Sequence, residues 1–203
     1  MQTRTLKDST VQTTRLARLQ EPHIAPLTAF AERIRRTDDP HEPYWAPYFD
    51  PESGGIRAQV LFLLESPGPK VSNTSFVSAD NPDRTAENMS GLLQQAELSR
   101  DKILLWNIFP WQLSAKQVVT PTKQQLIEAV PATLELLTLL PELKVIILVG
   151  KKAEAGWKHA VVPVDPGIEI LRCPHPSPQH FNIKPEAAAK ALSVLGHARQ
   201  LYS

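Results

Sequence analysis

Cysteine is almost absent from this chain of 203 residues, which contains only Cys173. One cysteine cannot form an internal disulfide, and it cannot by itself supply the ligands of a zinc site or an iron–sulfur cluster. The histidines His159, His180 and His197 do not stand at metal-ligand spacing from it. The sequence therefore predicts a protein that uses no metal and no other cofactor.

The chain also lacks an excess of either charge and any long apolar run. Its 22 Lys and Arg residues nearly balance 21 Asp and Glu residues, so any contact with nucleic acid should be local rather than spread over a cationic surface. No stretch is apolar for long enough to cross a bilayer, and charges interrupt residues 1–19, where a secretory signal would be apolar. We expect a soluble, intracellular (cytoplasmic) protein that binds no membrane.

What the chain has in quantity is apolar mass, 42% of its residues, and proline, with 19 residues. This length and composition suit one domain with one substantial core. Residues before Pro22 show no steady hydrophobic period. The interpretation is a flexible N-terminal tail over residues 1–20, a single domain over residues 21–203, and a monomeric protein with long loops punctuated by proline.

From residue 58 onward the hydrophobic pattern alternates between strands and helices. A run without polar alternation, such as residues 59–64, fits a strand that is buried on both faces. Further strands are expected at residues 103–109, 145–149 and 168–172, and helices at 25–36, 85–98, 123–140, 151–159 and 186–201. This alternation predicts an α/β fold, a three-layer α/β/α sandwich with a central four-stranded parallel sheet.

Three of the four predicted strands end in loops with unusual polar chemistry. The first strand leads into residues 65–69, the second carries Asn107, and the fourth leads into residues 175–182. Ligands of parallel sheets bind beyond the carboxyl ends of the strands, and these ends meet at one edge. The three loops are therefore expected to form one site.

The same loops resemble those of the uracil-DNA glycosylase superfamily. The likeness spans roughly residues 58–202 and rests on three motifs in a characteristic order: Leu64-Glu65-Ser66-Pro67-Gly68, then Asn107, then His175-Pro176-Ser177-Pro178. The resemblance implies a uracil-DNA glycosylase-like fold and an enzyme that flips a damaged base out of single-stranded or double-stranded DNA. Such an enzyme hydrolyses the N-glycosidic bond of uracil or a related deaminated base.

For the base itself, the resemblance implies roles for two side chains. Phe76 matches the aromatic residue on which related enzymes stack the flipped base, a contact worth about 1–3 kcal/mol. Asn107 matches the amide that reads the edge of uracil. Its NH₂ group donates to O4 and its carbonyl accepts from N3–H, a pattern that cytosine reverses.

The resemblance also implies a group for catalysis and a set of contacts with the DNA backbone. His175 matches the histidine that donates a hydrogen bond to O2 of the departing base, and such a preorganised donor lowers a barrier by about 3–4 kcal/mol. Gln179 stands where some relatives carry a side chain that wedges into the duplex, and glutamine is a weak wedge, which favours single-stranded or distorted DNA as substrate. The implied backbone contacts are Pro67, Gly68, Ser177, Pro178 and Gln179.

The sequence departs from the family pattern at two points. Ser66, which we group with the base-binding residues, stands where several branches place the Asp or Asn that positions the attacking water, and serine is a poor base. Glu65 matches a glutamate of the iron–sulfur branch, so it is the expected catalytic carboxylate beside His175. The cysteine ligands of that branch are absent, which indicates a cluster-free relative.

Other interpretations of the same residues stay open at this point. Glu65 also suits a salt-bridged loop carboxylate, Phe76 a core aromatic, and Asn107 and His175 ordinary loop-bonding groups. The pattern as a whole also fits a catalytically weak or inactive DNA-binding member of the superfamily. A third interpretation is an unrelated α/β enzyme that acts on a nucleotide or another phosphorylated metabolite.

Overall fold

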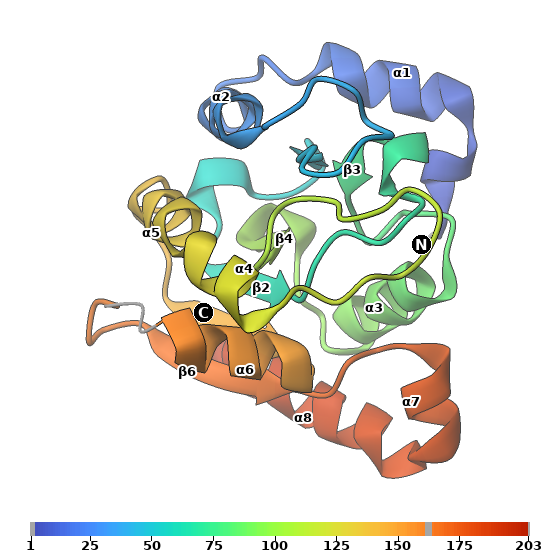
Figure 1. Cartoon of the computed structure of the whole chain (residues 1–203). Coiled ribbons are helices and arrows are strands. Elements are labelled where there is room, and N and C mark those ends of the chain that lie inside the picture. The colour runs from blue at the N-terminus through green and yellow to red at the C-terminus, as the bar shows by residue number, and fades with distance from the viewer. Residues whose placement is uncertain (1–2, 161–163, 203) are drawn as a thin grey trace.

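The computed structural model describes residues 3–160 and 164–202 as a layered arrangement of helices and strands (Figure 1). The chain begins with η1 (Thr5–Lys7), α1 (Ser9–Ala17), α2 (Ala25–Ile34), β1 (Tyr48–Phe49) and η2 (Gly55–Arg57). It continues with β2 (Val60–Leu64), η3 (Val71–Asn73), β3 (Phe76–Val77), α3 (Arg84–Gln95), η4 (Arg100–Lys102) and β4 (Ile103–Asn107). The remaining elements are α4 (Lys123–Glu128), α5 (Val130–Thr138), β5 (Val145–Val149), α6 (Lys151–Ala160), β6 (Glu169–Cys173), α7 (Pro178–Ile183) and α8 (Pro185–Tyr202).

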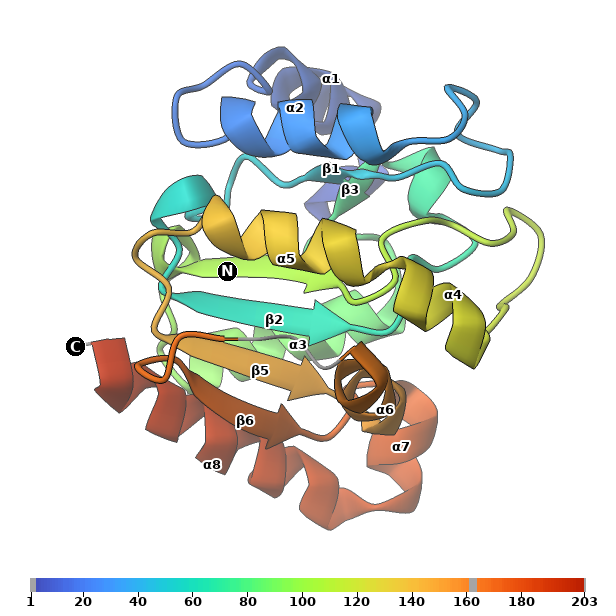
Figure 2. The ribbon, with the colours of Figure 1, turned by 60° about the vertical axis from the view of Figure 1, so that its left-hand side comes forward.

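The central sheet contains four strands in the order β4-β2-β5-β6, and every neighbouring pair is parallel. All four arrows point the same way in Figure 2, so their carboxyl ends share one edge. In register, Leu64 of β2 lies opposite Asn107 of β4. The predicted four-stranded parallel sheet is confirmed.

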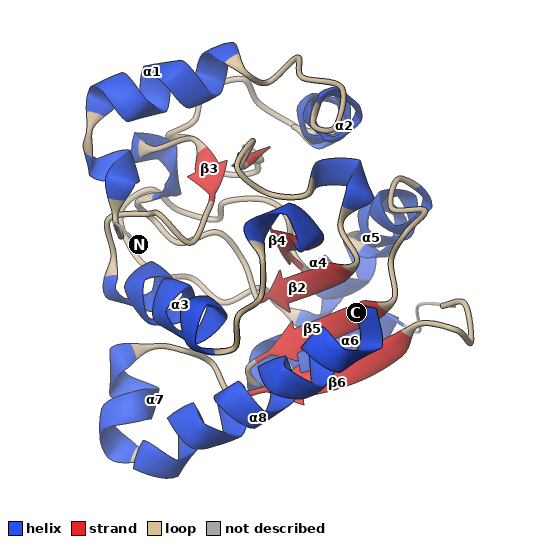
Figure 3. Ribbon diagram, turned by 180° about the vertical axis from the view of Figure 1, so that it is seen from behind, coloured by secondary structure: helices blue, strands red, loops and turns tan. Residues whose placement is uncertain are grey.

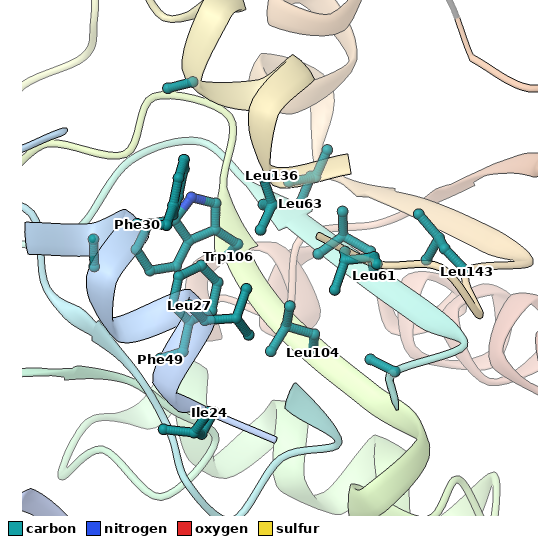
Figure 4. Packing of buried hydrophobic residues seen from close by; sticks show 14 of the residues in the cluster. Ile24, Leu27, Phe30, Phe49, Leu61, Leu63, Leu104, Trp106, Leu136 and Leu143 are labelled. Carbon is teal, nitrogen blue, oxygen red and sulfur yellow. The ribbon is translucent and has the colours of Figure 1, made fainter. Parts of the chain in front are cut away.

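The strands separate two layers of core, because successive side chains of a strand point to opposite faces. Leu61 and Leu63 of β2 pack in the layer that contains Leu27 and Phe30 of α2 and Leu136 of α5 (Figure 4). Val60 and Phe62 pack on the other face, which α3 and α8 cover (Figure 3). Burial on both faces explains why the strand sequences are apolar throughout, and it confirms the three-layer sandwich.

The single helix expected over residues 123–140 is two helices. The helix α4 ends at Glu128 and α5 begins at Val130, with Pro131 in its first turn. Proline has no N–H to donate, and the first turn of a helix is where a missing donor costs least. The hydrophobic period continues across the break, which is why the sequence pattern did not reveal it.

Residues 3–20 pack onto the rest of the structure instead of extending from it as a tail. Leu6 is fully buried, and the guanidinium of Arg15 in α1 is held between two carboxylates, Asp50 at 2.7 Å and Asp80 at 2.6 Å. Arg100 pairs with the same two carboxylates at 2.9 and 2.8 Å. The segment is attached by this polar network together with Leu6 and Leu19 in the apolar core, and those two positions are too far apart to show a helical period in the sequence. Among the described residues, no helix is long and apolar enough to cross a membrane.

Candidate active site

A pocket of about 520 Å³ opens at the carboxyl ends of the central strands. Sites for small molecules commonly have volumes of about 300–1,000 Å³. The wall of this pocket includes residues from the loops after β2 and β6 and from the end of β4. Six of the predicted site residues meet there: Glu65, Ser66, Pro67, Gly68, Asn107 and His175.

Asn107 forms part of the floor of the pocket as the last residue of β4. Its side chain is 4% exposed, and its amide makes no hydrogen bond to any group in residues 3–160 and 164–202. In the described part of the chain, neither of its amide atoms is both enclosed and without a partner, so the amide reaches the open space of the pocket. The amide is therefore available to a ligand that presents a matching donor and acceptor.

His175 lines the pocket, and its surroundings favour the neutral form of its imidazole. Burial lowers the pKa of its imidazole below the usual value, and the nearby His180 and Lys152 lower it further, against a smaller opposing effect of Asp83. The neutral imidazole is therefore the form present near pH 7. A neutral ring has one N–H to donate and keeps the other nitrogen as an acceptor.

Two contacts position the loop that carries His175, and nothing in the sequence indicated the first of them. The side-chain amide of Asn88 in α3 donates to the carbonyl of Pro176 at 2.8 Å. The hydroxyl of Ser177 caps α7 by accepting from the backbone N–H of His180, and Pro178 occupies the first turn of that helix. No sequence signal marks Asn88, because a helical asparagine is most often a solvated surface residue.

Glu65 keeps one carboxylate oxygen unpaired beside the pocket. Its Oε2 atom lies 3.3 Å from Nζ of Lys152, while its Oε1 atom is buried without a hydrogen-bond partner in the described part of the chain. Lys152 also donates to the hydroxyl of Thr120. The lysine thus holds one oxygen of the carboxylate, and the other oxygen is enclosed by protein atoms without a partner among the described residues.

Gln112 joins the loop after β2 to the loop after β4. Its side chain is fully buried, and its Nε2 atom donates to the carbonyls of Pro69 and Ser114, both at 3.1 Å. Two walls of the pocket are therefore connected through one amide. The residue gave no signal in the sequence, since its partners are backbone carbonyls that any sequence provides.

Phe76, the expected stacking platform, is not in the pocket wall. It is fully buried in the core beside Tyr48, with ring centroids 6.3 Å apart, and its neighbour Val77 lines the pocket instead. Both belong to β3, where consecutive side chains point in opposite directions. The structure therefore gives Phe76 the position of a core aromatic and leaves Val77 as the apolar side chain at that wall.

Three more predicted residues lie outside the pocket wall. Ser177, Pro178 and Gln179 form the N-terminal cap and first turn of α7, next to the loop of His175. Their contacts with a DNA backbone stay predictions.

Cys173, at the end of β6, has no sign of reactivity, since burial raises the pKa of its thiol to about 12. Across residues 3–160 and 164–202, no group of three or more His, Cys, Asp or Glu side chains is arranged to hold a metal ion.

Fold and site together define an α/β/α protein with a ligand pocket at the carboxyl edge of a parallel sheet. The family model of the uracil DNA glycosylase superfamily matches residues 51–196, and the chain belongs to that superfamily. This confirms the predicted family, and the roles of the residues in the three loops stay predictions.

The other comparisons add little to this assignment. No curated protein matches the chain. Among solved structures, the chain is similar to a solution NMR structure of a candidate uracil DNA glycosylase from Methanosarcina acetivorans. The two are 16% identical, with 71% of this chain and 92% of that chain covered and a TM-score of 0.44.

Proposed function

We propose that this protein is a DNA glycosylase that hydrolyses the N-glycosidic bond of uracil or a related deaminated base in DNA. The observation that carries the proposal is the amide of Asn107, buried and unpaired within the described residues, in the same pocket as His175 and Glu65. A recognition group, a leaving-group donor and a carboxylate are the three parts that this chemistry needs.

Base recognition is assigned to Asn107. The NH₂ group donates to O4 of uracil and the carbonyl accepts from N3–H, whereas cytosine offers a donor and an acceptor in the opposite order. A site that hydrogen-bonds a substrate rejects the wrong base because the site's own buried polar groups are then left unpaired. Val77 and Ser66 line the pocket beside this amide.

Departure of the base is assisted by His175. As the bond between C1′ and the base nitrogen breaks, its electron pair moves onto the base and negative charge collects on O2. The neutral imidazole, maintained by its lowered pKa, donates an N–H to that oxygen and stabilises the anion. A preorganised donor of this kind contributes about 3–4 kcal/mol to a barrier.

The attacking water is assigned to Glu65. A turn of the side chain brings its Oε1 atom, which is enclosed and unpaired among the described residues, into the pocket. There it accepts a proton from water while the water oxygen forms the new bond to C1′. Lys152 lies 3.3 Å from the other oxygen and holds the carboxylate in place. The products are the free base and an abasic site in the DNA strand.

Contacts with the DNA backbone are assigned to the rim of the pocket. Nothing lies within 4 Å of the space where a Cβ of Gly68 would be, so a sugar–phosphate chain can approach the main chain there. Pro67 stiffens the same loop. Further backbone contacts are expected from Ser177, Pro178 and Gln179 at the start of α7.

The first test is cleavage of oligonucleotides that contain a single uracil, hypoxanthine or xanthine, in single-stranded and duplex form, with chelator present. Alkali then reveals abasic sites. The variant His175→Ala should lose at least about a hundredfold in turnover while its DNA affinity changes little, since the lost contact forms mainly in the transition state. The matched control is His197→Ala, because His197 lies on α8, is half-exposed and pairs with Glu169 away from the pocket. Equal activity in the two variants would contradict the proposal.

One observation favours a second candidate function, a DNA-binding protein with little or no catalytic activity. Ser66 lines the pocket at the position where several relatives carry Asp or Asn. If Glu65 does not position water, the pocket binds a damaged base without releasing it. Intact binding of uracil-containing DNA, with no alkali-labile product from any base, would support this second function.

A further inference from the structure

Two adjacent valines stand exposed at the mouth of the pocket. Val118 is 80% exposed and Val119 is 36% exposed, and both belong to the pocket wall. Within residues 3–160 and 164–202, the other exposed large apolar side chains are Leu16, Ile127 and Ile183, and none of these lines the pocket. The apolar tip is therefore a feature of the site and not a scattered surface exposure.

The segment that carries the valines is held firmly at both ends. At its start, Gln112 bonds the carbonyls of Pro69 and Ser114, and the hydroxyl of Ser114 accepts from the backbone N–H groups of Lys116 and Gln117. At its end, Thr122 forms a capping box with Gln125 of α4. Figure 1 shows this loop between β4 and α4 crossing the carboxyl edge of the sheet. Because both ends of the loop are bonded, Val118 and Val119 stay exposed at its tip.

The chemistry around the tip suits a nucleic acid. Lys116 is exposed two residues before Val118, and Lys152, whose ammonium also pairs with Glu65, donates to Thr120 directly after Val119. Lysine side chains therefore stand on both sides of the two valines. Phosphates are bound by such charges, and the faces of bases are covered by apolar side chains. Proteins that extrude or kink DNA commonly insert an apolar wedge between base steps.

We propose that Val118, supported by Val119, is the wedge that enters the base stack of a duplex when the damaged nucleotide turns into the pocket. The inference rests on the proposed function for the identity of the ligand. It assigns insertion into the base stack to the loop between β4 and α4, because the glutamine at position 179 is a weak wedge. The proposal also implies that duplex DNA is a substrate, because only a duplex has a base stack that must be held open while the nucleotide is flipped.

The test compares Val118→Ala with Gln179→Ala and Leu16→Ala on the same uracil in single-stranded and duplex oligonucleotides. Leu16 is a control because it is an exposed apolar residue on α1, outside the pocket wall. Val118→Ala should lower kcat/KM on the duplex about tenfold or more and leave the single strand within about twofold, since only the duplex pays a few kcal/mol for unstacking. Val118→Leu should keep the duplex rate.

Three kinetic outcomes would overturn the wedge. Equal loss on both DNA forms would make the tip a lid over the base. No loss on either form would make it irrelevant to DNA, and a duplex-selective loss in Gln179→Ala alone would return the wedge to α7.

A second readout separates the wedge from catalysis. A 2-aminopurine placed beside a non-hydrolysable uracil nucleotide in a duplex becomes brighter when the stack opens. The wild-type protein should increase this fluorescence and Val118→Ala should not, at equal bound fraction. If the wild type opens the stack but cleaves no DNA, the wedge stands and the glycosylase proposal fails. If no variant binds DNA, both proposals are overturned.

Discussion

Gly150 and His175 lie against each other across the neighbouring ends of β5 and β6. A Cβ atom built on Gly150 would stand 2.9 Å from the Cβ atom of His175, and Gly150 has a φ angle of +86°. Its N–H also donates to the carbonyl of Cys173 at 2.8 Å. The missing side chain at position 150 thus sets how closely the histidine loop packs against the sheet.

The first prediction follows from this contact. Gly150→Ala should lower the free energy of unfolding by about 1–3 kcal/mol, because alanine is strained at a positive φ. It should also lower turnover about tenfold or more, because the new methyl group pushes His175 out of place. Urea unfolding and excision kinetics measure the two effects. Gly196→Ala on α8 is the control, since nothing lies within 4 Å of its added Cβ. Full turnover in a destabilised Gly150→Ala would show that the contact serves packing alone.

The second prediction concerns pH. Burial lowers the pKa of His175 below its ordinary value of about 6.5, so the folded protein binds fewer protons than the unfolded chain as the pH falls through that value. His175 should therefore cost no stability above about pH 6.5 and increasing stability below it. Unfolding of wild type and His175→Ala across this range measures the difference. The wild type should lose stability relative to the variant toward low pH, and identical pH slopes would contradict the lowered pKa.

The same titration predicts the pH dependence of the reaction. The excision rate should stay level from about pH 8 down to about pH 6.5 and fall only at lower pH, where the imidazole becomes protonated. A rate that rises as the pH drops through about 6.5 would mean that the protonated imidazole is the active form.

The third prediction concerns base choice. Asn107→Asp replaces a donor with an acceptor at the floor of the pocket, so the ionised side chain no longer donates to O4 of uracil. Excision of uracil should fall about tenfold to a hundredfold, the loss expected for a buried hydrogen bond, and the preference over cytosine should shrink. Competition between oligonucleotides carrying the two bases measures the ratio. An unchanged ratio would remove Asn107 from base recognition.

The fourth prediction concerns the polar network under the N-terminal segment. Arg15→Met leaves Asp50 and Asp80 to share Arg100 alone, and breaking a buried ion pair costs about 3–5 kcal/mol. The control Arg33→Met removes a half-exposed pair with Glu135 and should cost less than about 1 kcal/mol. Urea unfolding measures both values, and equal values would show that the network is not a main source of stability.

The same variant should weaken DNA binding as well. The hydroxyl of Ser78 donates to Asp50, and Ser78 lines the pocket, so a loosened network disturbs that wall. Arg15→Met should therefore raise KM more than it lowers kcat. A change in kcat alone would place the effect elsewhere in the site.

Much of the site could be predicted because its motifs carry their own local constraints. Proline and glycine in the loop after β2 and in residues 175–178 mark turns that follow buried strands, and parallel strands bring such turns to one edge. From these motifs alone, Glu65, Asn107 and His175 are predicted to lie together. The sequence did not show that Phe76 faces the core. Its strand has only two residues, which is too short for a pattern of alternating apolar and polar side chains.

The sequence by itself determined the order of the main strands and helices, the parallel sheet and the family. Those properties depend on local hydrophobic patterns and on short motifs, which are complete within a few consecutive residues. Only the tertiary structure decided that Arg15 holds the first helix in place, that Asn88 and Gln112 support the loops, and that Val118 stands exposed at the pocket. Each of these depends on contacts between residues far apart in the chain, and such contacts exist only after the layers have packed.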